Sequence, residues 1–292
     1  MRKKIAFIGV GNMATAILSG ITSRSVAPIL WSDIVLYNRH IEKITKYEAM
    51  GACLAGSLNE AVEIADCVVL CVKPQSFAEI LPELTKCKDV EKKLFVSIAA
   101  GISSESISRA TNGAPVVLVM PNTPMLIGQG VSAICKNDAV AEADLDFVSE
   151  MFASAGKVIR INEDEMNRII SVTGSSPAYV FMMIKAMYQG AVEQGLLQGN
   201  DLTKGLPEKD LLDSICDTII GAAMLMKSGN KTPDEQIQTV CSKGGTTERA
   251  VAELEKYDFY QAFSTAMQKC TDRADELRSL NNKGKGIRPW NN

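Results

Sequence analysis

An apolar run near the start of the chain ends in a glycine pattern that constrains the fold more than any other feature. The run IAFI at residues 5–8 is followed by GVGNMA at residues 9–14, the G-x-G-x-x-A form of the dinucleotide fingerprint. The first glycine permits a tight turn, the second lets the backbone approach a pyrophosphate, and the alanine keeps helix and strand close. Because a strand precedes this pattern and a helix is expected over residues 13–22, the pattern predicts nucleotide binding rather than a merely structural turn. The residues expected to bind the nucleotide are Gly9, Gly11, Asn12, Met13 and Ala14.

Short apolar runs alternate with helical stretches through the first half of the chain. Further strands are expected at residues 34–37, 67–72, 94–98 and 116–120, with a helix at residues 61–64. Near-continuous apolar strands that alternate with helices indicate a parallel sheet covered on both faces. The pattern therefore predicts an α/β Rossmann domain with a doubly wound parallel sheet at residues 1–161.

The strand signal disappears after residue 161, and the rest of the chain has helical periodicity. The apolar helix expected at residues 177–197 would have little to pack against in a small domain, so we expect a second subunit to cover it. This predicts an all-α C-terminal dimerisation domain at residues 162–280 and a flexible tail at residues 281–292. Its helices are expected at residues 164–170, 177–197, 208–227, 233–239 and 248–280.

Composition and charge exclude several classes of function. The net charge is −3, and binding to phosphates needs a basic surface, so we expect neither nucleic acid nor an anionic membrane as a partner. The apolar stretch at residues 178–187 is interrupted by Lys185 and is too short to span a bilayer, which favours a buried helix. The eight cysteines form no C-x-x-C pair and His40 is the only histidine, which argues against a metal site and a Ser-His-Asp triad. No secretory signal is recognisable, so we expect free thiols in the cytoplasm.

The end of the second strand should carry the group that reads the adenosine ribose. An acidic residue there would favour NAD, but the sequence continues as Tyr37-Asn38-Arg39-His40. Arg39 would pair with a 2′-phosphate, which predicts NADPH as the preferred cofactor, with NADH possible. The alternative is a solvated surface arginine. Asn38 and Arg39 are the candidate cofactor-binding residues of this segment.

The ends of the later strands supply the remaining cofactor candidates. The segment after the third strand would lie beside the adenosine half of the cofactor, and small residues after the fourth would let a nicotinamide ring lie against backbone. After the fifth strand, Asn122 could bond the cofactor or order the cleft. Simple strand-end geometry is the alternative for each segment. The candidates are Val72, Lys73, Pro74, Ala99, Ala100, Gly101 and Asn122.

A second glycine pattern, VCSKGGTTE at residues 240–248, indicates an anion site. Paired glycines followed by two threonines and a helical pattern present free backbone N–H groups at a helix N-terminus. Such a terminus binds a small carboxylate or phosphate. Together with the dinucleotide start, it suggests a reductase that acts on a small carboxylated substrate.

These motifs form an ordered series that resembles the pyrroline-5-carboxylate reductase family, which makes proline. The series is FIGVGNMATA, NR, VKPQ, SIAAGI, MPNTP, GSSPAYVF and VCSKGGTTERAVAELE, over residues 7–255. The resemblance implies NAD(P)H-dependent reduction of 1-pyrroline-5-carboxylate to L-proline by hydride transfer to the cyclic imine. It also implies a homodimer with interleaved C-terminal helices, often assembled into rings of five dimers, and a substrate pocket at the dimer interface.

The resemblance also implies roles for individual residues. Backbone N–H groups of the paired glycines and the first threonine would hold the substrate carboxylate. Thr247 would place its hydroxyl near the imine nitrogen, which makes it the catalytic candidate. Glu163 falls where the family has an acidic residue near the substrate, and Asn59 falls near the adenosine ribose. The implied substrate-binding residues are Glu163, Ser242, Gly244, Gly245, Thr246 and Thr247.

The sequence departs from the family pattern at several positions. Lys243 replaces a proline, and beside an anion site it could strengthen carboxylate binding or point to solvent. Ser176 replaces a glycine, Leu118 an arginine and Thr239 an asparagine, and Asn59 is displaced by one position. A divergent paralogue that reduces another cyclic imine, or a non-catalytic NADP-binding sensor, is therefore a competing hypothesis. A β-hydroxyacid dehydrogenase that uses Lys185 is a third, but the surrounding residues do not resemble that family's motif.

Overall fold

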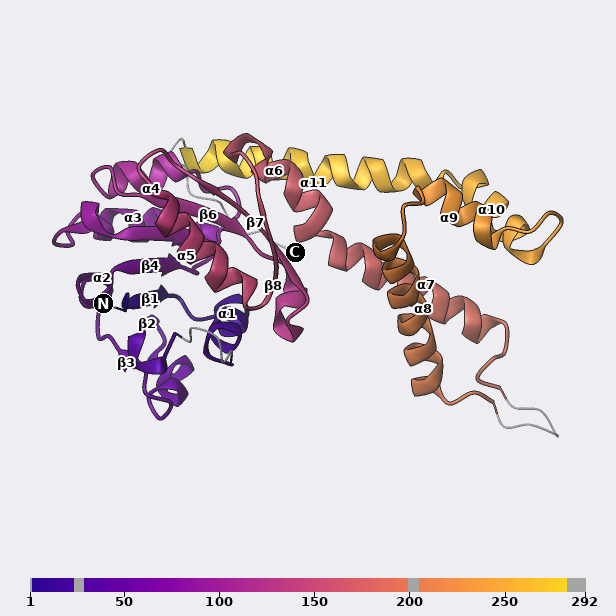
Figure 1. Ribbon diagram of the computed structural model, residues 1–292, viewed down its shortest axis with the longest axis horizontal. Coiled ribbons are helices and arrows are strands. Elements are labelled where there is room, and N and C mark those ends of the chain that lie inside the picture. Colours follow the sequence, from indigo (N-terminus) through magenta and orange to yellow (C-terminus); the bar gives the residue numbers. More distant parts are fainter. Residues whose placement is uncertain (1, 24–28, 199–204, 283–292) are drawn as a thin grey trace. The chain divides into compact units, whose positions relative to one another are not determined.

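The computed structural model describes residues 2–23, 29–198 and 205–282 (Figure 1). The chain forms two compact units, the first made of Met1–Ser175 with Gln268–Asn292 and the second of Ser176–Met267. The domain boundary predicted from the sequence lies between residues 161 and 162, where the strand pattern ends. The first compact unit continues to Ser175 and also includes the end of the chain from Gln268. Most of the expected flexible tail, residues 283–292, lies outside the described residues.

The first unit contains an eight-stranded sheet within its described residues, in the order β3-β2-β1-β4-β5-β6-β7-β8. The five expected strands are confirmed to within two residues, and the doubly wound Rossmann architecture with them. Three strands were not expected, and one of them, β7, runs antiparallel to β6, so the sheet is not wholly parallel. The strands are β1 (Ile5–Ile8), β2 (Ile34–Tyr37), β3 (Cys53–Leu54), β4 (Cys67–Leu70), β5 (Leu94–Ser97), β6 (Val116–Met120), β7 (Gly130–Lys136) and β8 (Gly156–Arg160).

The central strands are buried because both faces of the sheet are covered. Along β1, Ala6 and Ile8 join one hydrophobic cluster and Ile5 and Phe7 the other. This alternation follows from the two-residue period of a strand. Side chains from α2 (Leu58–Ile64), α3 (Phe77–Leu84) and α4 (Ser104–Ala110) fill the first cluster, and α1 (Asn12–Ser23) and α5 (Glu142–Ala153) fill the second.

The helical segment that follows β8 is irregular. It begins with a 3-10 turn at Glu163–Glu165, continues as α6 (Met166–Ile169) and passes through a π-helical turn at Ile170–Gly174. The three acidic residues of the 3-10 turn stand where negative charge favours a helix start. This segment belongs to the first unit, as does the C-terminal end of the last helix.

The second unit is entirely helical in its described residues, as expected. A single helical stretch was expected at residues 248–280, but the chain breaks at Tyr257 and at Asp258, whose φ of 54° is left-handed. The cap of α9 pairs Thr232 and Glu235 reciprocally, which fixes the helix start at Pro233. The helices are α7 (Ser176–Glu193), α8 (Glu208–Ser228), α9 (Pro233–Val240), α10 (Thr246–Lys256) and the first part of α11 (Phe259–Asn282).

The apolar helix α7 is exposed in this chain. None of its residues is buried among the described residues, so the expected burial is not provided by the chain itself. Phe181 and Met182 are 62% and 71% exposed. By length and composition alone, the helical stretch Glu163–Glu193 could cross a membrane, since its mean hydropathy reaches 1.2. Exposed apolar surface of this kind is typical of a site that contacts a protein or lipid partner.

Candidate functional site

The loop between β1 and α1 has the backbone that a dinucleotide pyrophosphate needs. Gly9 has a φ of +85°, and a Cβ there would lie 2.5 Å from Cγ1 of Val72, so only glycine fits. A Cβ added at Gly11 would meet nothing within 4 Å, which leaves its backbone open to approach. The helix α1 begins immediately afterwards, at Asn12, and Ala14 is 1% exposed between helix and sheet. The loop therefore fits the phosphates of a dinucleotide.

Asn38, which follows β2, stabilises this loop through hydrogen bonds of its side chain. Its side-chain Nδ2 donates to the carbonyl oxygen of Val10 at 3.2 Å, and its Oδ1 accepts from the backbone N–H of His40 at 3.1 Å. The Gly9 N–H donates to the carbonyl oxygen of Tyr37 at 2.9 Å. The Asn38 side-chain amide thus links the loop after β1 to the segment after β2. The sequence pattern did not indicate this role.

Arg39 lies beside the same loop and is paired with an acid. Its Nη2 is 2.6 Å from Oε2 of Glu79, and the two side chains are 66% and 68% exposed. Glu79 was not among the predicted residues, because it lies 40 positions from Arg39 in the chain and no helix was expected where α3 lies. The guanidinium is accessible to a ligand, but a carboxylate already occupies part of its donor fork.

Two other cofactor candidates have partners within the protein. The Asn59 Oδ1 accepts from the Cys87 thiol at 3.1 Å. Asn122 is 7% exposed; its Nδ2 donates to the Thr173 carbonyl oxygen at 3.0 Å and its Oδ1 accepts from the Val131 N–H at 2.8 Å. Of the two roles considered for Asn122, these bonds favour ordering of the cleft.

Two of the remaining candidates at the strand ends, Val72 and Gly101, contact the loop and α11 respectively. Val72 contacts the Gly9 position, and Lys73 precedes the 3-10 turn at Pro74–Ser76. Ala99 is buried, and Gly101 has a φ of +73°. A Cβ at Gly101 would lie 3.0 Å from the Cβ of Leu277, so the end of α11 packs on this turn.

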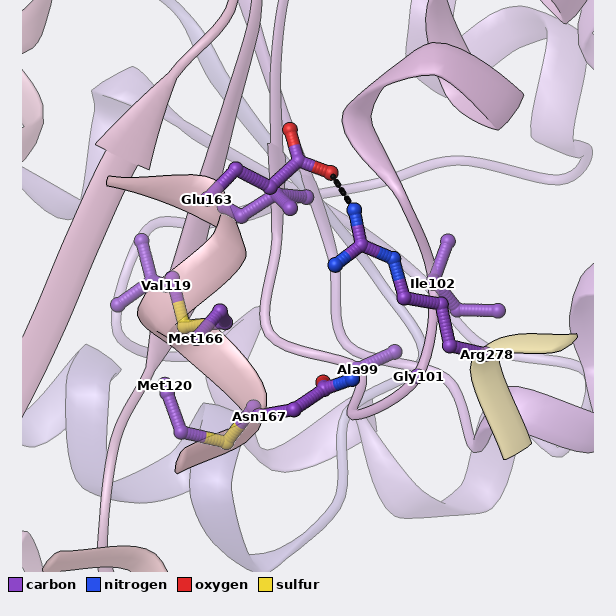
Figure 2. A pocket seen from close by; sticks show the side chains of 10 residues that line it. Ala99, Gly101, Ile102, Val119, Met120, Glu163, Met166, Asn167 and Arg278 are labelled. Carbon is purple, nitrogen blue, oxygen red and sulfur yellow. Dashed lines mark hydrogen bonds and ion pairs between the residues drawn. The ribbon is translucent and has the colours of Figure 1, made fainter. Parts of the chain in front are cut away.

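A pocket next to this turn contains Glu163 (Figure 2). The Glu163 carboxylate accepts from the backbone N–H of Ser104 at 3.2 Å, from the Ser104 hydroxyl and from Nη2 of Arg278 at 3.0 Å. The enclosed volume is about 10 Å³, which is about one water molecule, so this pocket does not hold a substrate by itself. Its lining residues are Ala99, Gly101, Ile102, Leu118, Val119, Met120, Glu163, Met166, Asn167 and Arg278.

Three thiols of the first unit are poor nucleophiles. Burial raises the pKa of Cys67 and of Cys135 to about 12, and the nearby Glu163 carboxylate adds to the effect on Cys135. Burial also raises the pKa of Cys71. Because the thiolate is the reactive form, these residues do not supply covalent catalysis near neutral pH.

The second glycine pattern forms the start of α10, as expected for an anion site. Gly244 has a φ of +75°, and the helix begins at Thr246. The Gly244 N–H, however, donates to Oε2 of Glu248 at 2.6 Å, and the Gly245 N–H donates to the Ser242 carbonyl oxygen at 2.9 Å. The first-turn N–H groups, which a helix cannot pair internally, begin at Thr246.

Glu248 was not among the residues predicted to bind the substrate. It stands at the third helical position, and its side chain reaches back four residues to the N–H of Gly244, which precedes the N-cap Gly245. A capping box spans three residues and ends at the N-cap, so this bond is not a capping box. The side chain places a carboxylate of the protein on a glycine N–H that was expected to hold a substrate carboxylate.

Comparisons with known proteins cover nearly the whole chain. Residues 163–277 match a family model described as pyrroline-5-carboxylate reductase dimerisation, and residues 4–101 match one described as NADP oxidoreductase, coenzyme F420-dependent. A pyrroline-5-carboxylate reductase from Corynebacterium melassecola is 35% identical over 277 residues, 94% of this chain and 98% of that protein.

Solved structures show the same fold. A pyrroline-5-carboxylate reductase from Coxiella burnetii is similar with a TM-score of 0.81 and 28% identity, over 94% of this chain and 98% of that one. A Plasmodium falciparum pyrroline carboxylate reductase with NADP bound has a TM-score of 0.83 at 24% identity, over 95% and 98%, which supports the fold alone.

Proposed function

Since the chain belongs to the pyrroline-5-carboxylate reductase family, we propose that it reduces 1-pyrroline-5-carboxylate to L-proline with NADPH, and that NADH serves as a second donor. The observation that carries the proposal is the match to a reductase of this family over 94% of the chain. The two family models, at residues 4–101 and 163–277, include the loop at Gly9 and the helix start at Thr246 respectively. A cofactor site and an anion site are the two parts that this reaction requires.

The first unit supplies the cofactor site. NADPH, when bound, supplies the hydride. The open backbone at Gly11 and the start of α1 accommodate the pyrophosphate, and Arg39 reads the 2′-phosphate. The turn at Ala99, Ala100 and Gly101 receives the nicotinamide. Asn38, Asn59 and Asn122 shape the loops around the cofactor through the hydrogen bonds described above.

The segment from Ser242 to Thr247 supplies the substrate site. Backbone N–H groups at the start of α10 hold the substrate carboxylate, for which the Glu248 side chain must release the Gly244 N–H. The Thr247 hydroxyl orients the imine nitrogen or relays a proton to it from water. No stronger acid is required, because orientation of donor and acceptor contributes most of the rate. Glu163 holds the end of α11 within the first unit, through Arg278.

The assembly proposed is a homodimer with interleaved C-terminal helices, which can associate further into a decamer. Support comes from the exposed apolar side chains of α7, such as Phe181 and Met182, inside the region that matches the dimerisation model. A second copy of the chain would cover this surface, which favours a protein partner over a bilayer. All eight cysteines lie in the described ranges and are free thiols, which suits the cytoplasm.

The test is turnover by the purified protein with racemic pyrroline-5-carboxylate. We expect NADPH to be oxidised with formation of an equal amount of proline, and NADH to be used more slowly. Cofactor binding with neither event would contradict the proposal and favour the sensor. NADPH oxidation with a different cyclic imine only would identify a divergent paralogue, in which Lys243 and Ser176 have changed substrate choice.

A further inference from the structure

An ion pair crosses the edge of the sheet beside the nucleotide loop. Arg39 follows β2, and Glu79 lies in the first turn of α3, after β4. In the sheet, β1 lies between β2 and β4. The 2.6 Å contact between Arg39 Nη2 and Glu79 Oε2 therefore joins the two segments that flank the turn at Gly9. Ligands of doubly wound folds bind at this edge.

The pair contributes little to the stability of the fold. Both side chains are about two-thirds exposed, at 66% and 68%, and exposed ion pairs are weak because water and salt screen them. The pair instead affects how well the Arg39 guanidinium can bind a phosphate group of a ligand. The guanidinium has five N–H donors and pairs with a carboxylate or a phosphate through two parallel donors on one edge. In this structure Glu79 occupies the Nη2 donor of Arg39.

The two nicotinamide cofactors would meet this pair differently. A 2′-phosphate that bound the Nη2 edge would compete with Glu79 for this donor, and it would bring negative charge next to the Glu79 carboxylate. A 2′-hydroxyl makes no such demand, and a carboxylate can accept a hydrogen bond from it. No acidic residue ends β2, and the Glu42 carboxylate nearby is paired with His40, 3.5 Å from its Nδ1. Glu79 is thus the carboxylate placed to act on the ribose.

We infer that Glu79 determines cofactor specificity by competing with the 2′-phosphate of NADPH for Arg39. This rests on the function proposed above, in which Arg39 reads the 2′-phosphate. Glu79 weakens binding of the phosphorylated cofactor and keeps NADH usable. Removing its charge should sharpen the preference for NADPH.

The experiment measures binding of two fragments that carry no nicotinamide, adenosine 2′,5′-bisphosphate and 5′-AMP, by calorimetry on the full chain. The ratio of their dissociation constants isolates the contribution of the 2′-phosphate. In Glu79→Gln we expect the bisphosphate to bind about three- to tenfold more tightly, with 5′-AMP changed less than about twofold. The matched control is Glu83→Gln, which removes the charge from another exposed pair of α3, the 2.7 Å contact of Glu83 with Lys86, and should leave the ratio unchanged.

The variant Arg39→Ala separates this inference from the role of Arg39 itself. We expect it to reduce the bisphosphate affinity to that of 5′-AMP. If it does so but Glu79→Gln leaves the ratio unchanged, competition by Glu79 is wrong while Arg39 keeps its role. If Arg39→Ala leaves the ratio unchanged, both assignments are wrong. Neither result bears on turnover of pyrroline-5-carboxylate, which tests the proposed function separately.

Discussion

The Glu163 carboxylate accepts a 3.0 Å hydrogen bond from the Arg278 guanidinium, although 115 positions separate the two residues in the chain. The same carboxylate accepts from the Ser104 N–H at the start of α4, so it ties the end of α11 to the Rossmann sheet. Asn167 adds a second link to α11 through Asp275 at 2.7 Å. The acidic residue expected beside the substrate therefore has a structural task in the first unit.

The first prediction concerns the stability of this link. Arg278→Met leaves the Glu163 carboxylate, which is 23% exposed, without its charged partner. Breaking a buried pair costs about 3–5 kcal/mol, and the partial exposure here reduces the expected loss to about 1–3 kcal/mol. Urea unfolding at one fixed protein concentration measures it, because assembly also affects stability.

The control for this variant is Arg109→Met. It removes a solvent-exposed pair with Glu105, in which both side chains are 75% exposed. We expect the free energy of unfolding to change by less than about 0.5 kcal/mol. Equal losses in the two variants would mean that the Arg278 link does not stabilise the first unit.

The second prediction concerns Thr247. In Thr247→Ala the hydroxyl that orients the imine nitrogen is lost, and we expect kcat to fall roughly ten- to hundredfold, the value of one hydrogen bond in the transition state. Thr247→Ser should retain most of the rate. The dissociation constant of NADPH, measured by fluorescence titration, should be nearly unchanged in both variants. An unaltered kcat in Thr247→Ala would remove this residue from the chemistry.

The third prediction concerns Glu248, whose carboxylate occupies the Gly244 N–H at 2.6 Å. Glu248→Gln weakens the competitor of the substrate carboxylate, so KM for the substrate should fall about two- to fivefold. Glu253→Gln, on the same helix and paired only with Lys256 at its surface, should leave KM unchanged. A raised KM in Glu248→Gln would show that the side chain builds the site instead of blocking it.

The fourth prediction concerns high pH. Burial raises the pKa of Cys67 and Cys135 from 9.0 to about 12, so the fold holds the thiols neutral while the unfolded chain ionises them. The stability they contribute is complete below pH 9 and is lost as the pH rises from about 9 to about 12. Denaturation midpoints across this window should therefore decline. In Cys53→Ser, which removes an exposed thiol, we expect the midpoint to decline as steeply as in the unaltered protein. In Cys67→Ala the midpoint should decline less steeply, because one buried thiol is gone.

Local patterns in the sequence were sufficient for much of the fold. The buried strands at residues 5–8, 34–37 and 116–120 have continuous apolar runs, and the structure confirms them. The strands β7 and β8 lack such runs, and their pairing depends on a close approach of backbones. A Cβ at Gly156 would lie 2.0 Å from the Gly130 carbonyl oxygen. A contact of that kind cannot be inferred from periodicity.

Local motifs in the sequence predicted some features of the candidate site, whereas the partners of several residues could be identified only from the fold. The glycine turn at Gly9 follows from a local motif. So does a helix after the second glycine pattern, although it was expected from residue 248 and begins at Thr246. The partners of Arg39 and Glu163 come from segments distant in the chain, so only the fold reveals Glu79 and Arg278. Glu248 is close to Gly244 in the chain, but their bond spans four residues and a capping box spans three, so that motif does not predict it.

The most direct test of the reductase function is the fate of a labelled hydride. NADPH deuterated at C4 of the nicotinamide, prepared in each stereochemical form, is supplied with unlabelled pyrroline-5-carboxylate, and the product is examined by mass spectrometry and NMR. We predict L-proline with one deuterium at C5 from one of the two labelled forms. Unlabelled proline from both forms, or oxidation of NADPH without proline, would contradict hydride transfer to the cyclic imine.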